Sequence, residues 1–238
     1  MKSIKFNKKI ITLLIALLLA FGFKFDEDIS EFINVLLYPK VSYAMENLPI
    51  YYGEDYILID ENEPKFTDEE KNREVFEKYS ELDYLGRCGV AFAKLGIESM
   101  PNEERESIGM IKPSGWQTKK YNIVDGQYLY NRCHLIGFQL SGENANEENL
   151  ITCTRYMNAG VMLEFENKVA NYIEETNNHV LYRVTPMFEN ENLVANGVQI
   201  EALSIEDNGK GIKFNVYIYN VQPGIEIDYK TGKSYLID

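Results

Sequence analysis

The feature that most limits the fold is a series of three closely spaced segments in which apolar and polar residues alternate. They lie at 180–188, 193–205 and 212–221. Alternation with a period of two is typical of strands, and a short loop such as 207–211 makes its two strands antiparallel neighbours. A long helical pattern precedes them at 157–176. The chain is therefore predicted to be α+β, with a central, mainly antiparallel sheet flanked by helices.

Further elements are expected in the first two thirds of the chain. Thr67 and Glu70 form the pattern of a capping box, which predicts a helix from there to about Tyr79. Its inward-facing residues would be Val75, Phe76 and Tyr79. Strands are expected at 87–95, 116–124 and 127–136, with a hairpin turn at 125–126 and a polar loop at 141–149.

Length and composition exclude several classes of protein. The 238 residues, 45% hydrophobic and 26% charged, can bury a sizeable core, which excludes disordered and fibrous chains. Lys and Arg number 24 against 37 Asp and Glu, so the net charge is -13. Such a chain repels nucleic acid at long range and is no generic DNA-coating protein, although a local anion site is compatible with it. Only two histidines are present, which excludes zinc sites built from several imidazoles.

The N-terminus has the pattern of an export signal. An almost entirely apolar run at 10–23 follows a basic stretch that contains Lys2, Lys5, Lys8 and Lys9. A basic region followed by an apolar run of this length is typical of a signal peptide, and an uncleaved membrane anchor is the alternative. Small residues before position 45 offer a cleavage site after Ala44. We therefore expect 1–44 to be a signal peptide or an N-terminal anchor with a linker, and 45–238 to form one domain.

The three cysteines, Cys88, Cys133 and Cys153, are an odd number for an exported chain. The count allows one disulfide with one free thiol, and it excludes a scaffold held together by many bridges. Their spacing does not favour a metal site. The sequence leaves open which two would pair.

His134 lies in an unusual neighbourhood. Strand alternation places it on the same face as Arg132, whose planar guanidinium suits phosphate. The window 111–134 contains Lys112, Lys119, Lys120 and Arg132 but only one acid, Asp125. A structural histidine at a strand end is the alternative. The positive window in an acidic chain favours a phosphate site instead.

A second anomaly lies on the helix predicted at 157–176. Glu166 interrupts an apolar stripe formed by Met162, Val169 and Ile173. A buried carboxylate is costly unless it is paired or linked to a metal. Asn158 lies two turns earlier on roughly the same side, and amide and carboxylate oxygens suit a hard cation such as Mg²⁺. A salt bridge to Glu166, with Asn158 as a simple helix cap, is the alternative, and the pattern alone does not decide.

The motif Asn131-Arg132-Cys133-His134 resembles the Asp-Arg-Gly-His motif of the DNA/RNA non-specific endonucleases, the ββα-metal nucleases. Within that family the chain is most similar to secreted streptococcal-type DNases, over about residues 80–232. The resemblance implies that His134 is the general base and that Arg132 holds phosphate. It also implies that Asn158 is the direct metal ligand, that Glu166 orients the water around the metal, and that Asn149 assists near metal and phosphate.

The same resemblance implies an activity for the domain 45–238. We expect an Mg²⁺-dependent endonuclease, with Mn²⁺ as an alternative ion, that hydrolyses DNA, and RNA as a second substrate, to 5′-phosphate ends with little sequence preference. The protein would be secreted or anchored to the outer face of the membrane, and it would contact the membrane only through its N-terminal segment. No protein partner is inferred. Asn131 and Cys133 depart from the family's Asp and Gly, which puts the rate in question but keeps the base and the metal ligand.

Two other classes of protein remain as alternatives. A catalytically silent nucleic-acid-binding surface protein could retain the nuclease fold, and only the Asn131 and Cys133 substitutions support it. A secreted structural or adhesive β-domain would account for Tyr-rich strands and an acidic surface but not for Glu166 in its stripe. Activity that depends on His134 and on a metal separates both from a nuclease.

Overall fold

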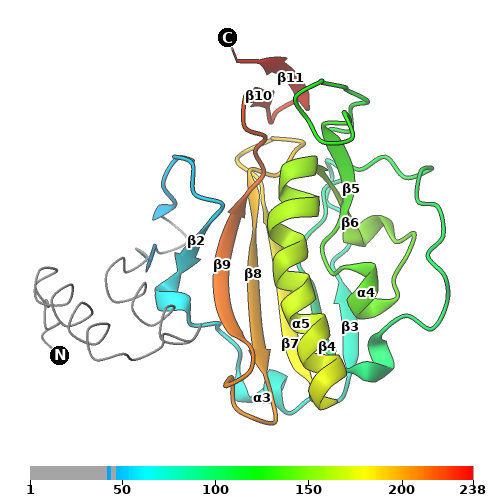
Figure 1. Ribbon diagram of the computed structural model, residues 1–238, viewed down its shortest axis with the longest axis vertical. Helices are drawn as coiled ribbons and strands as arrows, with labels where there is room; N and C mark the ends of the chain where they lie inside the picture. The colour runs from blue at the N-terminus through cyan, green and yellow to red at the C-terminus, as the bar shows by residue number, and fades with distance from the viewer. Residues whose placement is uncertain (1–41, 44–46, 238) are drawn as a thin grey trace, which may run out of the picture. The chain divides into compact units, whose positions relative to one another are not determined.

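The computed structural model describes residues 42–43 and 47–237, and within them the main element is a seven-stranded sheet. In spatial order its strands are β1 (Ser42–Tyr43), β2 (Tyr56–Ile59), β9 (Lys213–Tyr219), β8 (Gly197–Ser204), β7 (Val180–Met187), β4 (Ala91–Leu95) and β3 (Phe76–Tyr79). All neighbouring pairs are antiparallel except β1 with β2 (Figure 1). The predicted α+β class with a mainly antiparallel sheet is confirmed.

The three C-terminal strands predicted from alternation are confirmed. β7 and β8 pair from Val180 with Ser204 to Met187 with Gly197, and β8 continues antiparallel into β9. Alternate residues of β9 face opposite sides of the sheet. Phe214 belongs to the main core, whereas Tyr217 belongs to a separate cluster. The sheet therefore has two apolar faces.

One face of the sheet is covered by the predicted helix at 157–176, which begins as the π-helix η5 (Met157–Met162) and continues as α5 (Leu163–Thr176). α5 lies along the strands (Figure 1). Phe165 packs against Phe214 of β9 and Tyr56 of β2, with ring centroids 4.9 and 5.0 Å apart. Burial of this apolar side fixes the helix on the sheet.

Two small ribbons lie outside the main sheet. β5 (Tyr130–His134) pairs with β6 (Leu150–Thr154), and β10 (Ile225–Asp228) pairs with β11 (Lys233–Leu236). β6 was not expected from the sequence: it is only five residues long, and its burial is uniform, Thr152 and Thr154 included. The remaining described elements are η2 (Asp60–Asn62), α3 (Asp68–Lys71), η3 (Ile97–Ser99), α4 (Phe138–Ser141) and η4 (Glu147–Asn149).

The helix predicted from Thr67 to Tyr79 is wrong beyond its first turn. The capping box is present, with the Thr67 hydroxyl accepting from the Glu70 N–H and the Glu70 carboxylate accepting from the Thr67 N–H. The helix nevertheless ends at Lys71, and β3 follows at the edge of the sheet. Phe76 packs edge-on against Phe92 of β4 at 5.0 Å. Pairing with β4 therefore overrides the local helical signal.

The strand predicted at 116–124 is also wrong. A turn does form at 125–126, but only Lys120 and Tyr128 make a bridge, and the returning strand is limited to β5. The segment instead packs into a small core with β10, which contains Tyr121, Val124, Leu129, Tyr130, Ile225 and Ile227. Its aromatic residues favour a strand, yet they fill this core from irregular backbone. The strand predicted at 87–95 begins only at Ala91.

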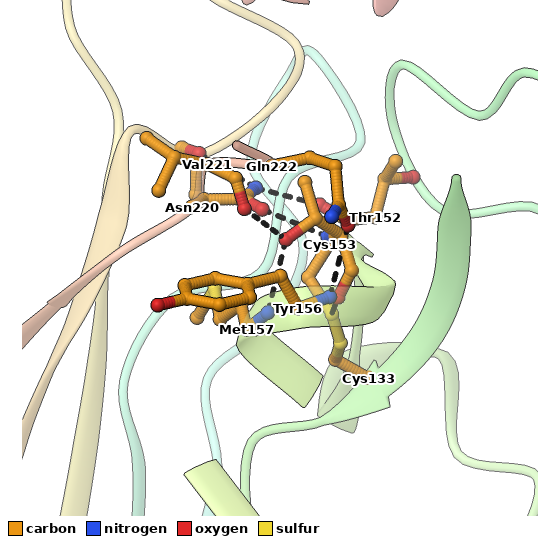
Figure 2. The surroundings of a disulfide bond; sticks show 10 residues. Cys133, Thr152, Cys153, Tyr156, Met157, Asn220, Val221 and Gln222 are labelled. Carbon is orange, nitrogen blue, oxygen red and sulfur yellow. Dashed lines mark hydrogen bonds between the residues drawn. A yellow bond between two sulfur atoms is a disulfide. The ribbon is translucent and has the colours of Figure 1, made fainter. Parts of the chain in front are cut away.

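The cysteines follow the predicted count, with one bridge and one thiol. Cys133 of β5 and Cys153 of β6 form a disulfide (Figure 2). Cys88 is a buried thiol. The predicted export signal lies in 1–44, nearly all outside the described residues. None of the helices in the described part is long and apolar enough to cross a membrane.

Candidate active site

Arg132 is fixed by three contacts. Its guanidinium donates to the backbone carbonyls of Ile111 and Gly109, the latter at 2.8 Å, and stacks on the Trp116 ring at 4.0 Å. These bonds tie β5 to the loop that precedes the 119–129 hairpin. They use two of the five N–H donors of the side chain. A planar cation held in this way is preorganised for an anion.

His134, at the end of β5, is a buried and neutral base. Its Nε2 lies 2.9 Å from the Asn144 carbonyl oxygen, and only 6% of the residue is exposed. Burial lowers the pKa of His134, and the positive charge of Arg105 lowers it further, against the opposing effects of the Asn144 bond and Glu143. A carbonyl can only accept, so Nε2 carries the hydrogen and Nδ1 is left as the basic nitrogen.

Asn149 lies directly beside this histidine in the fold. Its side chain is fully buried, and both ends of its amide bond the backbone of Ile136: Oδ1 accepts from the N–H at 2.9 Å and Nδ2 donates to the carbonyl at 3.0 Å. Its own carbonyl accepts from the Leu135 N–H at 2.9 Å. Asn149 therefore fixes the turn after His134, and an assisting role toward metal or phosphate stays a prediction.

Glu166 of α5 presses its carboxylate against the backbone of Gly137. A Cβ added at Gly137 would lie 2.7 Å from both carboxylate oxygens, so a larger residue here would displace the Glu166 carboxylate. Burial raises the pKa of Glu166 to about 8, although the charge of Arg105 and hydrogen bonds from Gln139 and Gly137 oppose the shift. Among the described residues no salt bridge to Glu166 is present, which leaves that alternative without support.

Asn158 lies on the π-helix η5 and is partly exposed. It is no helix cap, because Arg155 and Tyr156 are already helical and the Thr154 hydroxyl accepts the Met157 N–H at 3.1 Å. In an α-helix eight residues make 2.2 turns, so Asn158 and Glu166 would be offset by roughly 80°. A π turn holds more residues and reduces this offset.

The donor set fits a hard cation. Asn158 offers an amide oxygen, and Glu166 offers a carboxylate whose pKa is raised by burial against the opposing charge of Arg105. A cation beside Glu166 would favour the ionised form of this carboxylate. In the part of the chain that the structure describes, no cluster of three or more His, Cys, Asp or Glu side chains could hold a metal. Any ion held here would therefore keep much of its water.

Arg105 is a residue that the sequence analysis missed. It lies exposed in the loop before Gly109, its guanidinium is 5.9 Å from the Phe138 ring, and its charge acts on both His134 and Glu166. Glu103, Glu104 and Glu106 surround it in the sequence, so no basic pattern marked it. The same loop lines a cavity of about 450 Å³ that includes Asn144.

The order of these elements defines the class. Two antiparallel strands, β5 and β6, lead directly into a helix, with His134 on the first strand and Asn158 and Glu166 on the helix. This is the arrangement of the ββα-metal nucleases. Residues 67–205, more than half of the chain, match the DNA/RNA non-specific endonuclease family, and the chain belongs to this family.

Solved nucleases share the fold. NucA from Streptococcus agalactiae with a magnesium ion bound superposes with a TM-score of 0.71 at 23% identity, covering 89% of this chain and 98% of NucA. The Sda1 nuclease with a bound zinc ion gives a TM-score of 0.57 at 28% identity, covering 68% of this chain and 80% of Sda1. An extracellular endonuclease gives 0.55 at 20% identity, covering 69% of this chain and 87% of that one.

Proposed function

We propose that the protein is a secreted or surface-exposed, metal-dependent endonuclease that hydrolyses DNA, with RNA as a second substrate, to 5′-phosphate ends. The observation that carries this proposal is His134, whose Nε2 bonds the Asn144 carbonyl and whose Nδ1 has no hydrogen-bond partner among the described residues. Family membership supports nucleic acid as the substrate. Localisation follows from the basic and apolar start of the chain, and the extracellular endonuclease of similar fold is in line with it.

Proton transfer is the task of His134. Its Nδ1 takes the proton of the attacking water as that water approaches phosphorus in line with the leaving 3′ oxygen. The Asn144 carbonyl, 2.9 Å from Nε2, holds the ring in the required tautomer and stabilises the imidazolium that forms. The lowered pKa of His134 keeps the base unprotonated at neutral pH.

The other residues bind and position the substrate. Arg132 holds the phosphate with the donors that its backbone contacts leave over, and Asn149 fixes the backbone next to the base. Glu166 anchors the water around a cation that Asn158 would hold. We propose Mg²⁺ as that cation, with Mn²⁺ as an alternative; NucA was solved with magnesium and Sda1 with zinc. When bound, such an ion neutralises charge on the phosphate and leaving oxygen.

The test is a nuclease assay with the full chain and a matched pair of histidine variants. Supercoiled plasmid and an RNA transcript are incubated with Mg²⁺, with Mn²⁺ and with a chelator. His134→Ala should lose roughly 10²–10⁴-fold in rate, because general-base catalysis is typically worth that much. His179→Gln, which changes the only other imidazole, should keep the rate. Ligation of the products without prior phosphorylation would show 5′-phosphate ends.

Two outcomes would refute the proposal. Binding of DNA without metal-dependent cleavage would favour the catalytically silent surface protein. Near-normal cleavage by His134→Ala would remove the assigned base. Neither outcome depends on the identity of the metal.

A further inference from the structure

A disulfide joins the two strands that carry the two halves of the candidate active site. Cys133 directly precedes His134 on β5, and Cys153 lies on β6, five residues before Asn158. The bridge therefore connects the strand of the base to the strand that leads into the metal helix. The family motif that this sequence resembles has Gly at the position of Cys133, and glycine cannot make such a link.

The ribbon that the bridge crosses is short. β5 and β6 pair over five residues and form a sheet of their own, with no strand ladder to the seven-stranded sheet. Cys133 stands opposite Ile151 and Cys153 stands opposite Asn131, so the bridge runs diagonally, with the two Cα atoms 5.9 Å apart. A diagonal link resists sliding of one strand along the other, which the ladder alone opposes less strongly.

The β6 end of this link is fixed to the main sheet by buried hydrogen bonds. Asn220, which follows β9, accepts the Thr154 N–H at 2.9 Å and donates to the Thr152 carbonyl at 3.2 Å. The Thr154 hydroxyl donates to the Val221 carbonyl at 2.6 Å and accepts the Met157 N–H. Figure 2 shows these two partners together with Asn220 around Cys153. The start of the metal helix is thus anchored to the sheet, and the disulfide extends this anchor to β5.

Cys133 and Cys153 are both fully buried, and they belong to the main core together with Met157 and Met162. A reductant reaches such a bond only after the core opens, so the link is a constant feature of the exported protein and no switch. Cys88 belongs to the same core but is not linked, and its thiol lies 3.2 Å from the Leu150 carbonyl of β6. It therefore offers a matched control.

We propose that the Cys133–Cys153 disulfide is a positioning element of the active site, which holds His134 in a fixed place relative to Asn158 and Glu166. The proposal rests on the proposed function for the role of His134 as the base. A base that shifts by about 1 Å can lose on the order of 10²-fold in rate. The link thus acts on turnover through His134, and it touches no reacting atom.

The experiment compares three forms of the full chain. The first has the disulfide intact. The second is the same chain reduced in denaturant by a dithiol and refolded in its presence. In this step the dithiol gives two electrons and two protons to the S–S bond and becomes a cyclic disulfide, so free thiols rise from one to three per chain. The third is Cys133→Ala with Cys153→Ala, and Cys88→Ala is the control.

Two readouts follow, with circular dichroism to show that each form is folded. Both unlinked forms should lose about 10²-fold in kcat with little change in KM, whereas Cys88→Ala should keep kcat. Proton NMR titration of the two histidines needs no activity. In the unlinked forms the pKa of His134 should rise toward its ordinary value, because β5 no longer holds it buried between Arg105, Glu143 and Asn144. The pKa of His179 should stay unchanged as an internal reference.

The outcomes separate the positioning role of the disulfide from the proposed nuclease function. Folded, unlinked forms with unchanged kcat and unchanged His134 titration would overturn the positioning role. Unlinked forms that do not fold at all would also overturn it, because the bond would then be a requirement for folding. An inactive linked chain would refute the proposed function, and a shift of the His134 pKa on unlinking would still support the link as the element that positions this residue.

Discussion

At the scale of single residues, Glu166 has the least usual electrostatic environment of the site. It interrupts an apolar stripe whose other members, Met162, Val169 and Ile173, are at most 1% exposed, and its carboxylate lies against Gly137. Burial raises its pKa from 4.5 to about 8, so the metal-free protein holds a proton on it at neutral pH. Because the pKa is raised in the folded protein, ionisation of the Glu166 carboxyl destabilises the folded state. A nearby cation would favour the charged carboxylate and so lower this pKa.

Competition between Mg²⁺ and this proton is therefore expected. With a pKa of about 8, roughly 1% of Glu166 is ionised at pH 6 and about half at pH 8, so Mg²⁺ affinity should rise on the order of tenfold or more over this range. Calorimetric Mg²⁺ titration in a His134→Ala background, which removes the other titrating group, measures it. Glu166→Gln should bind weakly with no pH dependence, and Glu164→Gln, an exposed carboxylate paired with Lys168, should behave like the parent. Mg²⁺ affinity that is flat with pH in the parent would contradict the assignment.

At the scale of elements, the sequence correctly predicted the strands and the helix in which apolar residues recur with a regular period. The helix over 157–176 buries one face, while β7, β8 and β9 are largely buried, and each of these elements lies where alternation or the apolar stripe placed it. The region 67–79 behaves differently, because its capping box encodes one turn while Phe76 gains more from pairing with β4. β6 has only five residues, all buried and including Thr152 and Thr154, and so short a segment carries too little periodicity to reveal a strand.

The candidate site likewise combines residues that the sequence reveals with residues that only the structure reveals. Resemblance supplied His134, Asn158 and Glu166, and the structure brings their elements together as one ββα unit. Arg105 and the Asn144 carbonyl could not be found in this way, because their roles depend on where a loop without regular structure lies. The bonds of the Asn149 amide to Ile136 likewise appear only in three dimensions.

His179 joins three elements through two carboxylates. Its Nδ1 lies 2.5 Å from Glu206, after β8, and its Nε2 lies 3.1 Å from Glu98 on η3. The bond to Glu206 and then that to Glu98 raise the pKa of His179, and bonding lowers the pKa values of both carboxylates. The histidine therefore contributes stability below about pH 6.5, and this stability is lost as the pH rises through the raised pKa of His179. The two carboxylates contribute stability above about pH 4.5, and this stability is lost as the pH falls through their lowered pKa values.

This cluster should stabilise the protein most between about pH 4.5 and pH 6.5. His179→Gln should lower the thermal unfolding midpoint clearly at pH 5.5 and much less at pH 9, because the parent imidazole is then neutral. Scanning calorimetry of both proteins at the two pH values measures the difference. Lys213→Ala, which breaks a surface pair with Glu63 at 2.7 Å, serves as the control and should show no such pH dependence. An equal loss at both pH values would mean that His179 acts by packing alone.

At the scale of the whole molecule, an acidic chain must bind a polyanion. Its net charge is -13, so long-range attraction cannot bring nucleic acid to the site. The exposed Lys119 and Lys120 belong to the hairpin that leads into β5, and Lys120 lies 4.3 Å from the Tyr128 ring. Arg132 lies on β5 itself, one residue from the disulfide-bonded Cys133. Binding therefore depends on a few local phosphate contacts against general repulsion.

Salt should consequently weaken DNA binding in proportion to these few contacts. Each phosphate contact adds about -0.9 to the slope of log K against log salt concentration on duplex DNA. If Lys119 and Lys120 each meet one phosphate, the double change to Ala should make the slope less steep by about 1.8 and weaken binding at low salt. Fluorescence anisotropy tests this: duplex binding by His134→Ala chains is measured with a chelator between about 50 and 200 mM NaCl.

Lys213→Ala is the control and should leave the slope unchanged, because Lys213 is paired with Glu63. An unchanged slope in the double variant would show that the hairpin does not contact the substrate, and the positive charge at the site would then be that of Arg132 and Arg105.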